Sequence, residues 1–239
     1  MINNIIHKRN QRKGLFVSLP GFLYTQAKYG ELRYESAKRI LYIGVGHGLD
    51  VIVNSKLNTD GIYIGVDPYI ATDGNDDLDY EQLIQSTGEN VTIHRLKIED
   101  YLSKHKNSSE KFDLIVITDC LHHIFWTSKF IDRNYSKKDK IINLFKNILE
   151  IATPDAKLII GEASRYNLRR YWQLLKGFKT VDYYSKQSHK AWINLLKKAG
   201  WKIDDVKPYI PIKFSILENK IFNKIMFFLT HEYYIYCRK

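Results

Sequence analysis

Acidic and histidine side chains follow three apolar segments of this sequence. Asp67 follows the apolar run 62–66, and the pair His122 and His123 comes shortly after the run 114–117. Glu162 stands at the end of a third apolar run, which begins after Lys157. A carboxylate can bind ligand hydroxyls, and a histidine can take a proton from a hydroxyl or an acidic carbon near neutral pH. The alternative is that the two histidines only hold a loop by hydrogen bonds. Of the two, His122 is the first candidate for a base.

Glycines recur at every second position after the first apolar strand, at Gly44, Gly46 and Gly48. They allow backbone angles that a Cβ would block, and they let a ligand lie against the main chain. A helix expected over 48–56 adds unpaired N–H groups at its start. Asp67 stands 19 residues after the last glycine, where nucleotide-binding folds hold ribose hydroxyls. The pattern indicates a ligand site; a tight turn without a ligand is the alternative.

The spacing separates this turn from the dinucleotide fingerprint, because Leu49 stands where the third glycine of G-x-G-x-x-G would be. The turn resembles the first motif of class I S-adenosylmethionine-dependent methyltransferases. The ending Leu121-His122-His123-Ile124 resembles methyltransferases of the ubiquinone/menaquinone-biosynthesis type and their small-molecule relatives. The resemblance covers about residues 38–162 firmly and 186–239 in outline. It implies S-adenosylmethionine as cofactor and S-adenosylhomocysteine as product.

The resemblance also implies a set of cofactor-binding residues around the ends of the first four strands. They are Tyr42, Gly44, Gly46, Gly48, Asp67, Pro68, Tyr69, Ile98, Glu99 and Thr118. Asp67 is expected to bind the ribose, Tyr69 to stack on the adenine, and the Thr118 carbonyl to contact the cofactor's amino group. The sequence departs from the family at two positions, where Tyr42 and Lys97 stand in place of the usual acids.

Candidate acceptor-binding residues lie outside the regular repeats. Glu162 is expected to be a substrate-side acid or the partner of Arg165. The segment from Arg165 and Tyr166 to Trp172 combines positive charge with aromatic rings, which suits an anionic or aromatic substrate and also single-stranded nucleic acid. Tyr24 is a candidate lid residue, with ordinary packing as the alternative.

The chain has 239 residues, of which 44% are hydrophobic, enough for one substantial core. We expect a basic N-terminal segment or lid over 1–37 and one methyltransferase domain over 38–239, with substrate-side insertions at about 164–185 and 210–230. The net charge of +11 divides into +6 for residues 1–40, −8 for 41–120 and +13 for 121–239. Basic ends can attract an anionic substrate or nucleic acid; solvated lysine-rich helices are the alternative.

Two cysteines, Cys120 and Cys237, are too few for a disulfide framework or a zinc site. Cys120 is expected to be a buried free thiol, and a reducing interior is its natural setting. No segment reaches the roughly 18 apolar residues of a membrane span. We therefore expect no transmembrane segment and a cytoplasmic location. The expected chemistry needs no metal.

The regular segments alternate between strand and helix. We expect strands over 40–43, 62–66, 91–96, 114–117, 157–162, 201–209 and 232–238, and helices over 48–56, 78–86, 99–105, 138–152 and 188–199, with a turn at 153–156. The fold class implied by the resemblance is α/β: a Rossmann-like, seven-stranded, mostly parallel sheet of order 3-2-1-4-5-7-6, with strand 7 antiparallel and helices on both faces.

Three hypotheses for the function follow. The first is methyl transfer from S-adenosylmethionine to an oxygen or carbon of a small molecule, possible acceptors being anionic or aromatic. The second is an RNA methyltransferase, of the cap type or another, which the basic ends favour. The third is a non-catalytic binding protein that kept the fold, which Tyr42 and Lys97 motivate.

Overall fold

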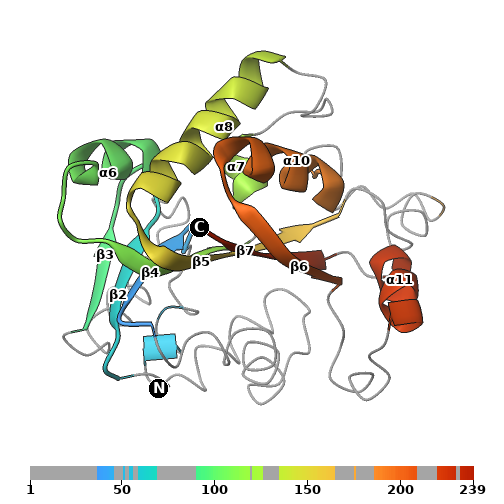
Figure 1. Ribbon diagram of the computed structural model, residues 1–239, viewed down its shortest axis with the longest axis horizontal. Helices are drawn as coiled ribbons and strands as arrows, with labels where there is room; N and C mark the ends of the chain where they lie inside the picture. Colours follow the sequence, from blue (N-terminus) through green and yellow to red (C-terminus); the bar gives the residue numbers. More distant parts are fainter. Residues whose placement is uncertain are drawn as a thin grey trace.

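The computed structural model describes part of the chain in detail, and Figure 1 shows its arrangement. The described residues are 37–45, 51, 54–55, 59–68, 90–118, 120–125, 135–164, 175, 186–208, 220–229 and 232–239. Among them, no helix is both long and apolar enough to cross a membrane.

One seven-stranded sheet forms the centre of the molecule. Its strands are β1 (Arg39–Ile43), β2 (Ile62–Val66), β3 (Val91–His94), β4 (Phe112–Thr118), β5 (Ala152–Ala163), β6 (Lys202–Pro208) and β7 (Glu232–Arg238). They lie in the order β3-β2-β1-β4-β5-β7-β6. The pairs among β1 to β5 are parallel, whereas β7 is antiparallel to both β5 and β6. The expected fold class and strand order are confirmed.

Alternation along the central strands explains why both faces of the sheet are covered. In β1, Leu41 and Ile43 belong to one apolar cluster, while Ile40 and Tyr42 belong to another. Successive side chains of a strand point to opposite faces. A strand that is apolar at every position therefore needs a partner layer on each side, as parallel sheets usually have.

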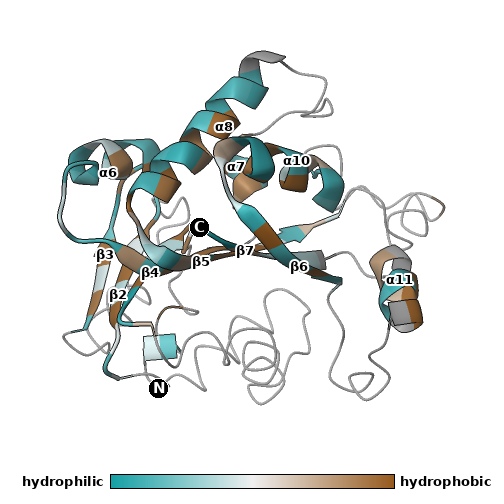
Figure 2. Ribbon diagram, in the orientation of Figure 1, coloured by the Kyte–Doolittle hydropathy of each residue, from teal (hydrophilic) through white to brown (hydrophobic). Residues whose placement is uncertain are grey.

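Three helices cover one face of the sheet, and their apolar side chains recur at helical spacing. They are α6 (Ile98–His105), α8 (Tyr135–Glu150) and α10 (His189–Ala199). In α8 the buried side chains are Ile141, Leu144, Phe145 and Ile148, one stripe of a 3.6-residue period. In Figure 2 the outer surfaces of these helices are mostly hydrophilic. On the other face, Val51 packs in the second cluster, as does Met226 of α11 (Lys220–Leu229).

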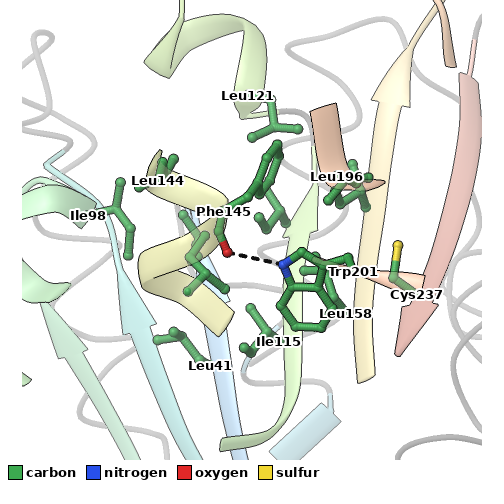
Figure 3. Close-up of a cluster of buried hydrophobic side chains, with 14 of the residues drawn as sticks. Leu41, Ile98, Ile115, Leu121, Leu144, Phe145, Leu158, Leu196, Trp201 and Cys237 are labelled. Atoms are coloured by element: carbon green, nitrogen blue, oxygen red, sulfur yellow. Dashed lines mark hydrogen bonds between the residues drawn. The ribbon is translucent and has the colours of Figure 1, made fainter. Parts of the chain in front are cut away.

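The larger core joins α8 and α10 to the sheet around two tryptophans. Trp192 and Trp201 are both fully buried. The indole N–H of Trp201 donates a hydrogen bond of 3.1 Å to the carbonyl of Phe145 (Figure 3). Phe145 also meets Trp192 edge to face, with ring centroids 6.4 Å apart. These contacts hold α8 and α10 together against the sheet.

The ends of α10 follow the sequence signals closely. The Ser188 hydroxyl accepts a hydrogen bond from the N–H of Ala191, and Gly200 ends the helix with a φ of 103°. A serine N-cap and a left-handed glycine are the usual terminators of a helix. The expected helix over 188–199 is confirmed to within one residue.

Several expected boundaries are wrong. The helix expected over 138–152 is α8, which runs from Tyr135 to Glu150. The turn expected at 153–156 lies inside β5. There Phe112 pairs with Ala152 but Leu114 pairs with Lys157, so β5 bulges by the intervening residues. A short helix, α7 (Leu121–Ile124), follows β4 where only a loop ending was expected. The expected helix 78–86 lies outside the described residues.

Candidate functional site

Four of the residues singled out in the sequence lie at or just beyond the ends of four strands, at one edge of the sheet. Gly44 follows β1, Asp67 follows β2, Cys120 follows β4, and Glu162 lies near the end of β5. These strands are parallel neighbours, so their carboxyl ends share an edge. Parallel sheets bind ligands at this edge.

Gly44 makes the turn that leaves β1, and only glycine fits there. Its φ is 79°, a left-handed value that other residues adopt at a cost. A Cβ on Gly44 would also overlap Cβ and Sγ of Cys120. Its N–H donates a 2.9 Å hydrogen bond to the carbonyl of Val66 at the end of β2. The glycine thus lets the turn after β1 lie against the residue that follows β4.

Asp67 is held at the tip of β2 by its main chain. Its N–H donates a 3.1 Å hydrogen bond to the carbonyl of His94 at the end of β3. Its residue surface is 8% exposed, a small value for an aspartate. Pro68, which follows it, is exposed. Asp67 therefore stands at the edge on an extended, fixed segment, and a short carboxylate in this position suits the hydroxyls of a ribose.

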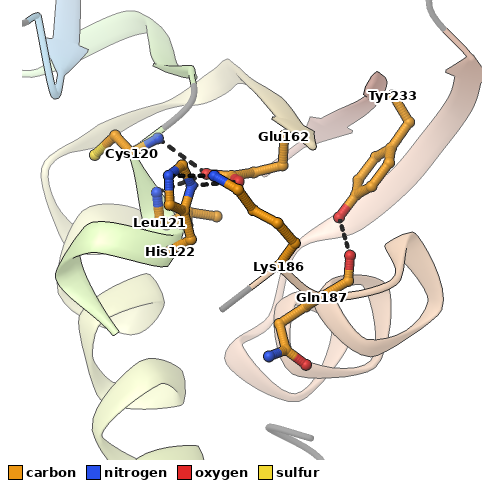
Figure 4. A network of polar contacts seen from close by, with 7 residues as sticks. All are labelled: Cys120, Leu121, His122, Glu162, Lys186, Gln187 and Tyr233. Atoms are coloured by element: carbon orange, nitrogen blue, oxygen red, sulfur yellow. Dashed lines mark hydrogen bonds and ion pairs between the residues drawn. The ribbon is translucent and has the colours of Figure 1, made fainter. Parts of the chain in front are cut away.

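Glu162 organises the turn after β4 through one buried carboxylate (Figure 4). Its Oε1 accepts hydrogen bonds from the N–H groups of Cys120, at 2.9 Å, and Leu121, at 2.6 Å. Its Oε2 lies 2.9 Å from Nδ1 of His122. The residue is 2% exposed. The predicted substrate-side acid is thus also the anchor of α7, and a buried carboxylate is tolerated because both oxygens accept hydrogen bonds.

Lys186 completes this network, and the sequence analysis did not single it out. Its Nζ donates a hydrogen bond to Nε2 of His122, on the opposite side of the ring from Glu162. Lys186 precedes α10 and lies 64 positions from His122 in the chain. No spacing pattern links a lysine at that separation to a histidine, so only the folded chain shows the pair.

His123 differs from His122 in its surroundings. The two rings are 4.1 Å apart between centroids and tilted by 41°, but His122 is buried while His123 is exposed. Partial burial is the main cause that lowers the pKa of His123, and the neighbouring His122 and Lys186 act in the same direction. Glu162 and Asp67 oppose them.

The other expected cofactor residues have simple structural settings. Tyr42 is a core residue at 3% exposure, and its hydroxyl accepts a 2.7 Å hydrogen bond from the Asn54 amide. Ile98 is buried at the start of α6, where Glu99 is exposed in the first turn. Thr118 ends β4 opposite Gly161. Their contacts with a cofactor stay predictions. Lying outside the described residues are Gly46, Gly48, Tyr69, Arg165, Tyr166 and Tyr24.

The two cysteines are buried free thiols, as expected for Cys120. Within the described ranges, no group of three or more His, Cys, Asp or Glu side chains is arranged to hold a metal ion.

Solved structures of other proteins have a fold similar to that of this chain. No family model matches the chain, and no curated protein matches it. Among solved structures, a SAM dependent methyltransferase from Archaeoglobus fulgidus aligns with a TM-score of 0.58 and 14% identity, over 93% of this chain and 95% of that one. The N-methyltransferase NodS from Bradyrhizobium japonicum aligns with a TM-score of 0.55 and 12% identity, over 92% of this chain and 97% of that one.

A third solved structure extends the likeness to nearly the whole chain. The plantazolicin methyltransferase BpumL, in complex with a monoazolic desmethylPZN analog and SAH, aligns with a TM-score of 0.59 and 14% identity, over 99% of this chain and 89% of that one. Together with the strand order, these alignments show that the chain has the fold of the SAM-dependent methyltransferases.

Proposed function

We propose that this protein is an S-adenosylmethionine-dependent methyltransferase that methylates an oxygen or carbon of a small molecule. One observation carries the proposal: at the carboxyl edge of the sheet, Gly44 makes a turn that only glycine fits, and its N–H donates a hydrogen bond to the carbonyl of Val66, the residue before Asp67. The sequence motif that resembles the methyltransferases begins at this glycine. Structures of that fold, one of them a complex with SAH, support the same reading.

The residues at the edge have separate tasks in this proposal. Asp67 binds the two ribose hydroxyls, and the turn that starts at Gly44 lies against the methionine part of the cofactor. The bound cofactor supplies an electrophilic methyl group on a sulfonium. The protein then has to hold the acceptor in line with that methyl and take up its proton. The network around Glu162 lies beyond β4 and borders the acceptor side.

The class of acceptor is the finer part of the proposal. Similar folds belong to enzymes whose names mention plantazolicin, N-methyl transfer and 8-amino-8-demethyl-D-riboflavin, and these names support a small-molecule acceptor. We propose that the segments 1–37, 164–185 and 210–230 complete its pocket, because they interrupt the strand–helix repeat. The ubiquinone/menaquinone type of acceptor rests on the Leu121-His122-His123-Ile124 resemblance.

Calorimetric titration of S-adenosylmethionine and S-adenosylhomocysteine tests the cofactor site. We expect binding by the wild type, and tenfold or greater weakening in Asp67→Ala, which is about 1.4 kcal/mol. Asp60→Ala is the matched control, because Asp60 is an exposed acid in the turn before β2 and its loss should leave the affinity unchanged. Equal affinities of the wild type and Asp67→Ala would refute the assignment of Asp67.

Absence of binding by the wild type would instead favour the non-catalytic alternative. If the cofactor binds, an acceptor screen follows, divided between aromatic or anionic small molecules and RNA. Methylation confined to RNA would replace the small-molecule proposal with the alternative that the charge of +11 motivates.

A further inference from the structure

Both ring nitrogens of His122 are already engaged. Oε2 of Glu162 can only accept, so Nδ1 of His122 carries the ring proton in the 2.9 Å contact between them. The lone pair on Nε2 then accepts from the ammonium of Lys186. A second ring proton would set an N–H against that ammonium. Both ring nitrogens of His122 are therefore occupied, and no lone pair is left for a substrate proton.

Lys186 is fixed in this position by its neighbour in the chain. Gln187 is 1% exposed, its carbonyl accepts a 3.1 Å hydrogen bond from the Tyr233 hydroxyl, and it forms a parallel bridge with Ser164. Ser188 then caps α10. The backbone directly after Lys186 is thus held by Ser164, which follows β5, by Tyr233 of β7 (Figure 4) and by the start of α10.

His123 offers what His122 lacks. Its side chain is exposed, and within the part of the chain that the structure describes neither of its ring nitrogens makes a hydrogen bond. The charged or titratable groups that act on it are His122, Lys186, Glu162 and Asp67. The net effect, led by partial burial, lowers the pKa of His123 below 6.5. Its ring is thus neutral at pH 7 and has a lone pair to accept a proton.

We infer that His123, and not His122, takes the proton of the methyl acceptor. Lys186 is the positioning residue, because its hydrogen bond to Nε2 of His122 keeps that ring from acting as the base. The inference rests on the proposed function. The acceptor atom gives its proton to a ring nitrogen of His123 and uses the electron pair to bond the methyl carbon, while the pair of the carbon–sulfur bond returns to sulfur. Residue type and position alone made His122 the first candidate, whereas the partners of its ring favour His123 as the base.

Chemical modification of the full chain tests the division without any acceptor. Diethyl pyrocarbonate acylates a histidine nitrogen that has a free lone pair, and tandem mass spectrometry separates the two neighbouring sites. At pH 7 we expect His123 to react at least tenfold faster than His122. Lys186→Met should make His122 reactive, whereas Lys186→Arg, which keeps a donor, should keep it protected. Lys190→Met, which removes an exposed lysine of α10, is the control and should change neither rate.

Kinetics with the acceptor found in the screen tests the catalytic part. We expect His123→Asn to lower kcat by about 100-fold or more at unchanged calorimetric affinity for S-adenosylmethionine. The wild-type rate should fall as pH drops below about 6.5, and this fall should vanish in the variant. Adding Lys186→Met to His123→Asn should restore part of the rate, because it frees His122.

The two outcomes that overturn the inference are distinct from failure of the proposed function. Equal acylation of His122 and His123 in the wild type would refute the claim that Lys186 blocks Nε2 of His122. An unchanged kcat in His123→Asn would refute the claim that His123 is the base. A wild type that binds no S-adenosylmethionine would overturn the proposed function, and the acylation pattern would still decide whether Lys186 holds His122.

Discussion

Glu162 near the end of β5 accepts a hydrogen bond of 2.9 Å from Nδ1–H of His122 in α7. The same carboxylate receives the N–H groups of the two residues before this histidine. A neighbouring strand, and not β4 itself, therefore fixes the direction in which the chain leaves β4. Glu162 thus fixes the start of α7, the short helix in which His123 lies.

Glu162 and Lys186 should be energetically coupled through His122. In Glu162→Gln the amide oxygen can still accept the two main-chain hydrogen bonds, but its NH₂ group then faces Nδ1, so the ring proton must move to Nε2 and meet Lys186. We expect the free energy of unfolding to fall by about 1–3 kcal/mol. In urea unfolding, adding Lys186→Met should recover at least about 0.5 kcal/mol of that loss.

An exposed acid provides the control for this cycle. Glu150 pairs with Lys106 at the surface, and Glu150→Gln should change the free energy of unfolding by no more than about 0.5 kcal/mol. Strict additivity of Glu162→Gln and Lys186→Met would mean that the ring of His122 does not transmit the charge of one to the other.

Gly44→Ala should be among the most damaging glycine substitutions. It combines a left-handed backbone with overlap between the new Cβ and Cys120, so we expect a loss of about 3 kcal/mol or more in the free energy of unfolding. Gly200→Ala separates the two causes, because Gly200 also has a positive φ, of 103°, but its nearest neighbour would be a flexible Leu149 methyl at 3.1 Å. A loss of about 1–2 kcal/mol is expected there. Equal losses would show that overlap with Cys120 is unimportant.

Stability should fall on mild acidification because three histidines resist protonation in the folded chain. Burial is the first cause that lowers the pKa of His94, His123 and His189 below 6.5. The unfolded chain takes up these protons near pH 6.5 and the folded chain only at lower pH, so acid favours unfolding across that interval. Thermal unfolding between pH 7.5 and 5.5 should show a falling Tm.

His189 allows this pH dependence to be traced to one group. Its ring lies 4.9 Å from that of Phe227 and 5.6 Å from that of Tyr233. His189→Gln removes its titration and should flatten the fall of Tm with pH, whatever it does to Tm at pH 7.5. The same slope in the variant and the wild type would exclude His189 as a source.

Tyr233→Phe should loosen the segment that aims Lys186. The variant keeps the buried ring but leaves the carbonyl of Gln187 without the 3.1 Å hydrogen bond from the hydroxyl. We expect a loss of about 1–2 kcal/mol in the free energy of unfolding. If rigidity of this segment protects His122, its acylation by diethyl pyrocarbonate should also rise. Tyr234→Phe, on the same strand but half-buried, is the comparison, and it should leave the acylation of His122 unchanged.

The sheet could be predicted because its information is local. Strands such as β1 and β4 are apolar at nearly every position. The turn at Gly44 and the helix end at Gly200 each depend on a single glycine. The order of the strands came from the resemblance to a family, since the sequence of one chain does not state which strands are neighbours. Boundaries were less certain: the bulge in β5 depends on pairing with β4, and the residues Pro154 and Asp155 within it are equally typical of a turn.

The sequence by itself determined which residues stand at the ends of the parallel strands, and with them Gly44, Asp67, His122, His123 and Glu162. A residue's distance along its own strand decides that placement. Only the tertiary structure decided what each side chain does there. Glu162 turned from a substrate-side candidate into the anchor of α7, and Lys186 joined His122 from 64 positions away. Hydrogen bonds between distant segments depend on the packing of whole elements, and that packing is a property of the folded chain and not of any local pattern.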